Sequence, residues 1–198
     1  MSESLKNQII WDNFRNGSKE ALEIIYEENY SSLYHYGVKF SRDKELVKDL
    51  IHELFIELID SGTRIASTDN IRFYLLKALR YKLIKQLANH SNNSGSDADL
   101  GEFNLIESIE SQLINKEIEQ ELQTRIISAI KKLSIKQQEI IYLRFYSDIS
   151  YQEIATLFDV KIQTVRNLMS RSISSLKDEL QQNKLSKNLI LMVLNLKI

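Results

Sequence analysis

The sequence contains no cysteine and no proline, and only five of its 198 residues are glycine. A chain without cysteine cannot form a disulfide or a thiolate metal site, which suits the reducing cytoplasm. The lack of proline favours long uninterrupted helices, and the shortage of glycine argues against a glycine-rich phosphate-binding loop. No apolar run reaches about 18 residues, the length that a membrane-spanning helix needs. These absences predict a cytoplasmic protein that does not insert into a membrane.

Side chains suited to catalysis are few and scattered. The three histidines, His35, His52 and His90, form no His-x-x-x-His pair that could begin a metal site. The serines lie at expected helix starts and not on the glycine-flanked turns that hold a nucleophile. The sequence therefore predicts no enzyme activity, no bound metal and no cofactor.

A net charge of −1 conceals a strong division of charge along the chain. Residues 1–90 hold 13 basic and 13 acidic residues, residues 91–124 hold one basic and eight acidic, and residues 125–184 hold ten basic and six acidic. Segregation of this kind favours a nucleic-acid partner, although the neutral total by itself would argue against one.

Apolar residues recur at helical spacing along most of the chain. One such row, in the stretch 44–60, includes Leu54, Phe55 and Leu58 on its apolar face. The spacing predicts helices over about 3–16, 18–40, 44–60, 71–89, 115–132, 135–146 and, in two parts, 150–180.

The predicted fold is all-α, with two small helical domains at 1–90 and 115–182. A polar, aperiodic stretch follows residue 89, and an acidic stretch follows that, so we expect a flexible acidic linker at 91–114. Residues 183–198 form an apolar C-terminal tail that is too short to cross a bilayer.

The stretch from Ser150 to Leu176 has the pattern of two helices joined by a tight turn. Ser150 and Glu153 form a capping box at its start. Residues 159–161 provide the three-residue connection that a DNA-binding helix-turn-helix uses. The second helix has a polar face without a carboxylate, and its side chains suit phosphates and base edges: Gln163, Thr164, Arg166, Asn167, Ser170 and Arg171. We interpret this face as a DNA-recognition surface, the alternative being an ordinary solvated one.

A second basic stretch, 64–85, holds six basic residues and one acidic residue, and it also contains three aromatic residues: Phe73, Tyr74 and Tyr81. Unpaired DNA requires cations that follow its backbone and rings that accept unstacked bases. The alternative is an aromatic core under a solvated surface, and this is the interpretation for Phe73 and Leu76. For Arg72, Arg80 and the loop 62–70 we favour binding.

Three segments resemble bacterial sigma factors of the sigma-70 family, of the small extracytoplasmic-function (ECF) type with only regions 2 and 4. DLIHELFIEL at Asp49–Leu58 is similar to the D-x-x-Q-E-x-F pattern of region 2, with His52 in place of glutamine. FYLLKALRYKLIKQLAN at Phe73–Asn89 is similar to the family's Y-L-x-x-I-A-x-N helix, with Tyr81 in place of asparagine. Residues 133–177, which include EIATLFDVKIQTVR, are similar to region 4, with Asp159 in place of the usual turn glycine.

The resemblance implies a transcription initiation factor that binds core RNA polymerase, brings it to promoter DNA and helps to open the duplex. An anti-sigma factor that masks regions 2 and 4 is a further partner in this family. The residues implied to face polymerase are Asp49, His52, Glu53, Phe55 and Ile56. Those implied to bind the minus-10 element are Arg64, Asn70, Arg72 and Arg80. Those implied to bind the minus-35 element are Tyr151, Thr164, Arg166, Asn167, Ser170 and Arg171.

Two other classes of protein stay open at this point. A stand-alone helix-turn-helix regulator would need a ligand pocket or a phosphoacceptor in the N-terminal half, where the sequence predicts no strands and no acidic cluster. A pure interaction module would leave the basic recognition face without a purpose. Both alternatives fit the sequence less well than an initiation factor.

Overall fold

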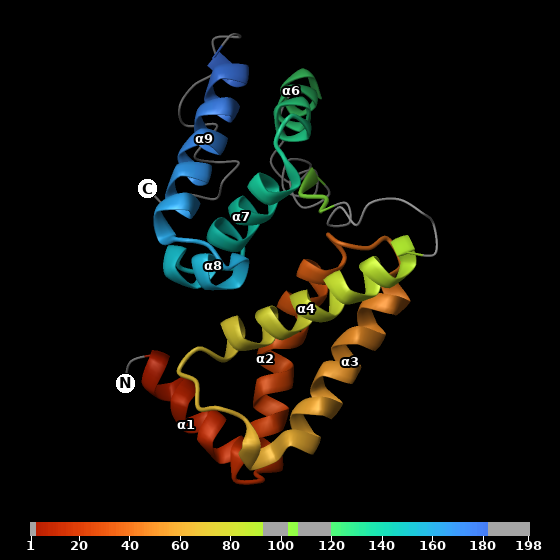
Figure 1. Ribbon diagram of the computed structural model, residues 1–198, viewed down its shortest axis with the longest axis vertical. Helices are drawn as coiled ribbons and strands as arrows, with labels where there is room; N and C mark the ends of the chain where they lie inside the picture. Colours follow the sequence, from red (N-terminus) through yellow and green to blue (C-terminus); the bar gives the residue numbers. More distant parts are fainter. Residues whose placement is uncertain (1–2, 93–102, 107–119, 182–198) are drawn as a thin grey trace. The chain divides into compact units, whose positions relative to one another are not determined.

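The computed structural model describes residues 3–92, 103–106 and 120–181, and the chain divides into two compact units, Met1–Glu102 and Phe103–Ile198 (Figure 1). The described residues form helices and turns but no β-strand. This confirms the all-α prediction. The predicted apolar tail at 183–198 and the predicted helix start at residue 115 lie outside the described residues.

Over residues 3–92, the first unit packs four α-helices and one short 3-10 helix around an aliphatic and aromatic core. Helix α2 contacts the three other α-helices. Trp11, Tyr36 and Leu76 are completely buried, so the core interpretation of Leu76 is confirmed, whereas Phe73 is only half-buried. The elements of this unit are α1 (Glu3–Arg15), α2 (Lys19–Gly37), α3 (Lys44–Ser61), η1 (Gly62–Arg64) and α4 (Ile71–Asn92) (Figure 1).

Three of these helices begin at side chains that accept hydrogen bonds from free backbone N–H groups. The Ser18 hydroxyl accepts from the N–H of Ala21 at 3.1 Å. The Asp43 carboxylate accepts from the N–H groups of Glu45 and Leu46, both at 3.1 Å. Asn70 does the same for α4, since its Oδ1 accepts from the N–H of Phe73 at 3.0 Å. Caps of this kind fix where a helix starts, because they satisfy donors that the helix leaves unpaired.

The described residues of the second unit form the helices α6 (Gln120–Lys131), α7 (Ile135–Phe145), α8 (Tyr151–Phe158) and α9 (Ile162–Gln181) (Figure 1). Ser134 forms a capping box at the start of α7: its hydroxyl accepts from the N–H of Gln137 while its own N–H donates to the Gln137 side chain. Ile141, Ile154 and Val165 are completely buried in the core.

A short segment ahead of these helices belongs to the same unit, although it lies within the range 91–114 that the sequence assigns to the linker. Phe103 and Leu105 are buried. The Phe103 ring meets the Tyr142 ring edge-on, with centroids 5.8 Å apart. The Leu105 N–H donates to Oε1 of Gln138 at 3.3 Å. The Nε2 of the same Gln138 side chain donates to the carbonyl of Leu133 at 3.1 Å. This segment is therefore anchored on α7 through apolar contact and a shared hydrogen-bonding side chain.

Replacing Gly37 with Ala is expected to destabilise the first unit. A Cβ at residue 37 would lie 2.5 Å from Cγ1 of Val47, which is completely buried and, being β-branched, has little freedom to turn away. Overpacking of this kind typically costs about 1–3 kcal/mol, against the ~1 kcal/mol by which alanine is the better helix former. We expect a lower free energy of unfolding in urea, measured by circular dichroism.

Val47 supplies the control. Gly37→Ala combined with Val47→Ala should be no less stable than Val47→Ala alone, because the second change removes the obstructing methyl group. Additive losses in the double variant would show that the contact between residues 37 and 47 is not the cause.

Candidate nucleic-acid interface

The predicted helix-turn-helix is present in the second unit, and its turn is set by local chemistry. At the start of α8 the Ser150 N–H donates to Glu153 at 2.8 Å, and the Glu153 N–H donates to the Ser150 hydroxyl at 3.2 Å. At its end Asp159 adopts a left-handed conformation with φ 52°. The Val160 N–H then bonds to the Ala155 carbonyl at 3.0 Å. The chain reverses over residues 159–161, as predicted.

Packing fixes which face of α9 looks outward. Val165, Met169 and Leu176 of α9 are buried, as are Ile154 and Ala155 of α8. Because the buried positions of α9 share one face, the opposite face must lie in solvent.

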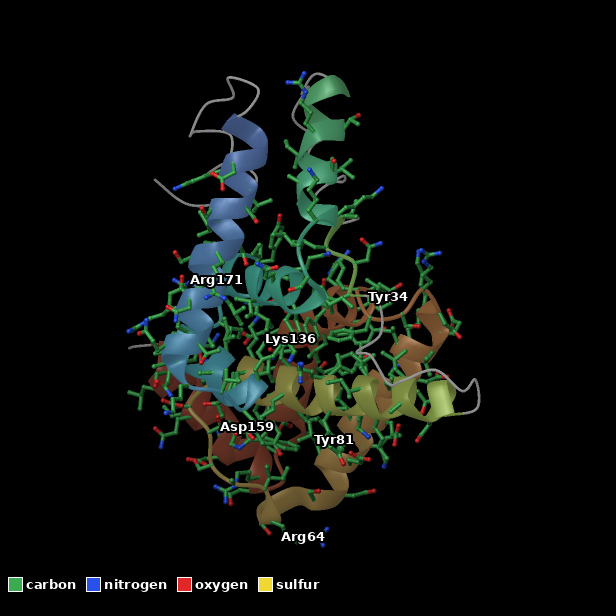
Figure 2. The ribbon with its side chains drawn as sticks, turned by 45° about the horizontal axis from the view of Figure 1, so that its top comes forward. Tyr34, Arg64, Tyr81, Lys136, Asp159 and Arg171 are labelled. Carbon is green, nitrogen blue, oxygen red and sulfur yellow. The ribbon has the colours of Figure 1, made fainter. Side chains whose placement is uncertain are left out.

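The outward face of α9 carries every polar residue that the sequence analysis assigned to it. Arg171 is labelled on α9 in Figure 2, and Asp159 marks the turn before the helix. Within the described residues no carboxylate pairs with Arg166 or Arg171. The exposed residues on this face are Gln163, Thr164, Arg166, Asn167, Ser170 and Arg171.

An open groove of about 500 Å³ lies beside this face, and residues of both α8 and α9 line it. Arg166, Ser170 and Lys177 line it from α9, and Tyr151 lines it from α8. The guanidinium of Arg144 lies over the Tyr151 ring, 5.4 Å from its centroid. The predicted residues Tyr151, Arg166 and Ser170 are thus brought together at one surface.

Sequence reasoning missed Arg144 and Lys177. The contact between Arg144 and Tyr151 joins the end of α7 to the start of α8, across a turn in which the Arg144 guanidinium also donates to the Ile149 carbonyl at 3.4 Å. The spacing of residues within one helix cannot predict a contact between two different helices. Lys177 could have been found, because it follows Arg166 and Ser170 at spacings of 11 and 7 residues, which return to the same side of a helix.

Replacing Asp159 with Gly is expected to stabilise the second unit by up to about 1 kcal/mol, because only glycine adopts the left-handed conformation without a steric cost. Thermal unfolding followed by circular dichroism would record a raised Tm. Asp178→Gly is the matched control: it removes the same charge from within α9 and should lower stability, since glycine is a poor helix former. A lower Tm for Asp159→Gly would contradict this account of the turn.

The four residues implied for the minus-10 element have structural contacts of their own. Arg64, at the tip of the loop after α3 (Figure 2), donates to the carbonyls of Asp60 at 2.6 Å and Ser61 at 3.3 Å. Asn70 caps α4. Arg72 is half-buried and donates to the Ser32 hydroxyl of α2 at 2.9 Å, while its buried Nε has no hydrogen-bond partner among the described residues. Arg80 is half-buried on α4. Their role in DNA binding stays a prediction.

Four of the five residues implied to face polymerase are exposed on α3, and the fifth, Phe55, is buried. Asp49, His52, Glu53 and Ile56 are exposed, with 58% of Ile56 accessible to solvent. Ile59, which the sequence analysis did not single out, is 52% exposed one turn further along.

Phe55, the fifth residue implied to face polymerase, is buried. Its side chain is only 5% exposed, and its ring meets that of Tyr26 edge-on, with centroids 4.9 Å apart. Phe55 therefore packs inside the first unit, on the side of α3 that faces α2, and its contact with polymerase stays a prediction.

Lys82 belongs to the basic stretch of α4 but points at α3. Its side chain is only 11% exposed, and its Nζ lies 2.7 Å from a carboxylate oxygen of Glu57 and 3.1 Å from one of Glu53. Burial lowers the pKa of Lys82, but the hydrogen bonds to Glu57 and Glu53 outweigh it, so the pKa lies above its ordinary value. Lys82 therefore stays charged and joins the two helices.

Among the described residues, no group of three or more His, Asp or Glu side chains could hold a metal ion. None of the described helices qualifies as a candidate for crossing a membrane.

Together, the exposed acid-free face of α9 and the capped turn before it define a helix-turn-helix DNA-binding protein. Residues 123–176 match the family model for sigma-70, region 4. Over 177 residues the chain is 20% identical to RNA polymerase sigma factor YlaC of Bacillus subtilis (strain 168), covering 84% of this chain and 95% of that protein. Over 165 residues it is 21% identical to ECF RNA polymerase sigma factor SigX of the same organism, covering 82% and 85%.

A solved structure agrees at the level of the fold. Sigma factor RpoE from Bartonella quintana, crystallised with the anti-sigma factor NepR, matches with a TM-score of 0.56 and 19% identity, covering 83% of this chain and 97% of that one. Residues 123–176 thus match sigma-70 region 4, and over more than four-fifths of its length the chain is similar to sigma factors, one of them of the extracytoplasmic-function type. The resemblance found in the sequence is confirmed.

Proposed function

We propose that this protein is a transcription initiation factor that binds core RNA polymerase, directs it to specific promoters and assists in opening them. The observation that carries the proposal is the outward face of α9, where Arg166, Asn167, Ser170 and Arg171 stand exposed without a carboxylate among them. The sigma-factor relatives cover more than four-fifths of the chain, so the proposal extends to both units.

The face of α9 suits the major groove of the minus-35 element. Arginine forms two hydrogen bonds with the O6 and N7 atoms of guanine, and asparagine forms two with the edge of adenine. Arg166, Arg171 and Asn167 therefore read bases in this proposal. Tyr151 and Thr164 contact phosphates, which add affinity without sequence preference.

The exposed face of α3 suits a protein partner. Ile56 provides an apolar centre, and Asp49, His52 and Glu53 provide a polar border, the composition that protein interfaces commonly have. We assign this face to core polymerase. Arg64, Asn70, Arg72 and Arg80 remain the proposed minus-10 contacts.

Two linked units explain how specificity arises from small surfaces. Each unit alone offers a few base or backbone contacts, which supply modest affinity. When polymerase holds both units, binding of the first element raises the effective concentration of the second unit at its own element. We therefore expect weak promoter binding by the free chain and strong binding by the holoenzyme.

The proposal also covers regulation and location. The related RpoE is held by an anti-sigma factor in its crystal structure, and we propose a partner of that kind for this chain. The protein acts in the cytoplasm, where bacterial transcription takes place, and it acts as a binding protein without catalysis, metal or cofactor.

The test is a pull-down with purified core RNA polymerase, followed by run-off transcription on a fragmented genomic template, with core polymerase alone as the control. A stable complex that initiates at defined sites is the expected result. A chain that binds specific DNA but not polymerase would be a stand-alone regulator, and the proposal would fail. Polymerase binding without initiation would also contradict it and would indicate a decoy.

A further inference from the structure

A row of three exposed side chains runs along α4. Lys77, Tyr81 and Lys85 are spaced by four residues, which places them on one side of the helix, and all three are exposed. Tyr81 stands out from α4 in Figure 2 and is 70% exposed, a large fraction for an aromatic side chain. A helix rises about 1.5 Å per residue, so the backbone position of Tyr81 lies about 6 Å along the axis from that of each lysine.

The other aromatic residues of this helix are held by the fold. Tyr74 packs against Trp11, with ring centroids 4.8 Å apart, and burial raises the pKa of its hydroxyl. Phe73 is half-buried. Tyr81 is therefore the aromatic side chain of the basic stretch whose ring is available to a ligand.

The charge around Tyr81 is positive. Helix α4 contains no Asp or Glu. Glu53 and Glu57 face it from α3, and both are engaged by Lys82. Lys77 and Lys85 have no ion-pair partner within the described part of the chain. Two ammonium groups without an ion-pair partner in the described part of the chain thus flank one exposed ring, and the two carboxylates that also line this surface share Lys82.

The row borders an open groove of about 770 Å³. Lys77, Tyr81 and Lys85 line one side, and Ser67 and Thr68 line it from the loop before α4. Its volume lies within the range of about 300–1,000 Å³ that is typical of small-molecule sites. The surface is therefore hollowed beside the ring and can receive a flat group against it.

We propose that Tyr81 is the platform on which an unpaired promoter base stacks, while Lys77 and Lys85 contact the phosphates on either side of that base. The proposal rests on the initiation function above and deepens it. Single-stranded nucleic acid is bound elsewhere by this combination of a cationic path with an exposed ring. The family pattern has asparagine at this position, whose side chain can only form hydrogen bonds, so the tyrosine changes the chemistry of the contact.

Stacking has a consequence for specificity. Every base has a flat face, so a ring accepts all four with similar energy, whereas an amide distinguishes them by hydrogen bonding. Tyr81 thus stabilises the open state with little preference for the base it holds. The free energy needed to open the duplex at that position is lowered whatever the sequence.

The experiment compares holoenzymes that contain wild-type chain, Tyr81→Ala or Tyr81→Phe. Each initiates on a promoter recovered from the genomic run-off assay, supplied either as a duplex or with a mismatched bubble over the minus-10 element. Losing a stacked base should lower initiation on the duplex about 10- to 100-fold for Tyr81→Ala. The loss should be much smaller on the bubble, which needs no opening. Tyr81→Phe keeps the ring and should behave like wild type.

Two further readouts separate stacking from a structural role. The fluorescence of 2-aminopurine, placed in turn at each minus-10 position, should be quenched at one position by wild type and Tyr81→Phe but not by Tyr81→Ala. Lys77→Gln and Lys85→Gln should each reduce the salt dependence of single-strand binding by the holoenzyme, by about 0.7 in the slope of log K against log salt concentration.

Three results would overturn the inference: full duplex activity of Tyr81→Ala, equal weakness of Tyr81→Phe and Tyr81→Ala, or equal losses on duplex and bubble together with weaker core binding. In each case a wild-type chain that initiates normally leaves the proposed function intact. If the wild-type chain itself fails to initiate, the proposed function fails, and this inference fails with it.

Discussion

Alanine in place of Arg166 or Arg171 is expected to reduce promoter-specific initiation about 10- to 100-fold while leaving the fold unchanged. Each bidentate contact between arginine and guanine is worth about 1–3 kcal/mol of discrimination. Both side chains are exposed and make no ion pair within the described residues, so their removal should change the free energy of unfolding by no more than about 0.5 kcal/mol.

Run-off transcription by the holoenzyme, on the native promoter and on promoters with single substitutions in the minus-35 element, measures this effect. Arg42→Ala is the matched control, since it removes an exposed arginine from the other unit, outside the proposed surfaces. Each arginine variant should lose its preference at one base pair. If it weakens all promoters equally, that arginine contacts phosphate and does not read a base.

Replacing Ile56 with Asp is expected to weaken core polymerase binding by a factor of about 30 or more. A carboxylate at the apolar centre of an interface would lose its hydration without a partner, and residues at such centres commonly contribute about 2 kcal/mol or more. Because 58% of Ile56 is already exposed, the substitution should leave the fold stable. Binding to core, measured by surface plasmon resonance, gives the result.

Ile24→Asp controls for the change of charge, because Ile24 is also exposed, at 39%, but lies on α2. It should bind polymerase like wild type. Phe55→Ala would be a poor probe of the same interface: the buried ring would leave a cavity, at a typical cost of about 3–5 kcal/mol in stability. Unchanged binding by Ile56→Asp would remove α3 from the polymerase interface.

The first residues of several helices could be predicted, because the hydrogen bonds that set where these helices start are local in the sequence. Ser18, Asp43, Ser134 and Ser150 each cap a helix by accepting a hydrogen bond from an N–H two or three residues further on. Such a bond depends on residues that are adjacent in the sequence, so a pattern of types and spacings is sufficient to find it.

The position of Phe55 shows where two kinds of sequence reasoning conflict. Its helical spacing grouped it with Leu54 and Leu58 on the apolar face, while the family resemblance implied that it faces polymerase. Leu54, Phe55 and Leu58 are all buried, as the periodicity predicts, and the contact of Phe55 with polymerase stays a prediction. A motif records which residues accompany a function and does not distinguish those that touch the partner from those that support the helix.

Contacts between distant segments could not be predicted. Lys82 is one of the six basic residues of the stretch 64–85, but the packing of α3 against α4 places Glu53 and Glu57 beside it. Arg144 and Tyr151 meet only because the turn between α7 and α8 brings them together. In both cases the sequence shows the charge or the ring, but the packing of helices decides what each one meets.

The anchored segment Phe103–Leu105 affects how the helix-turn-helix unit would have to be prepared for study alone. A fragment cut at residue 115, the predicted start of the second domain, would uncover the Tyr142 ring and leave Oε1 of Gln138 without the N–H that it accepts from. Exposed aromatic surface and an unsatisfied amide both favour aggregation and lower stability. A fragment that begins at Phe103 keeps the segment that covers Tyr142 and is the version to express for measurements on this unit.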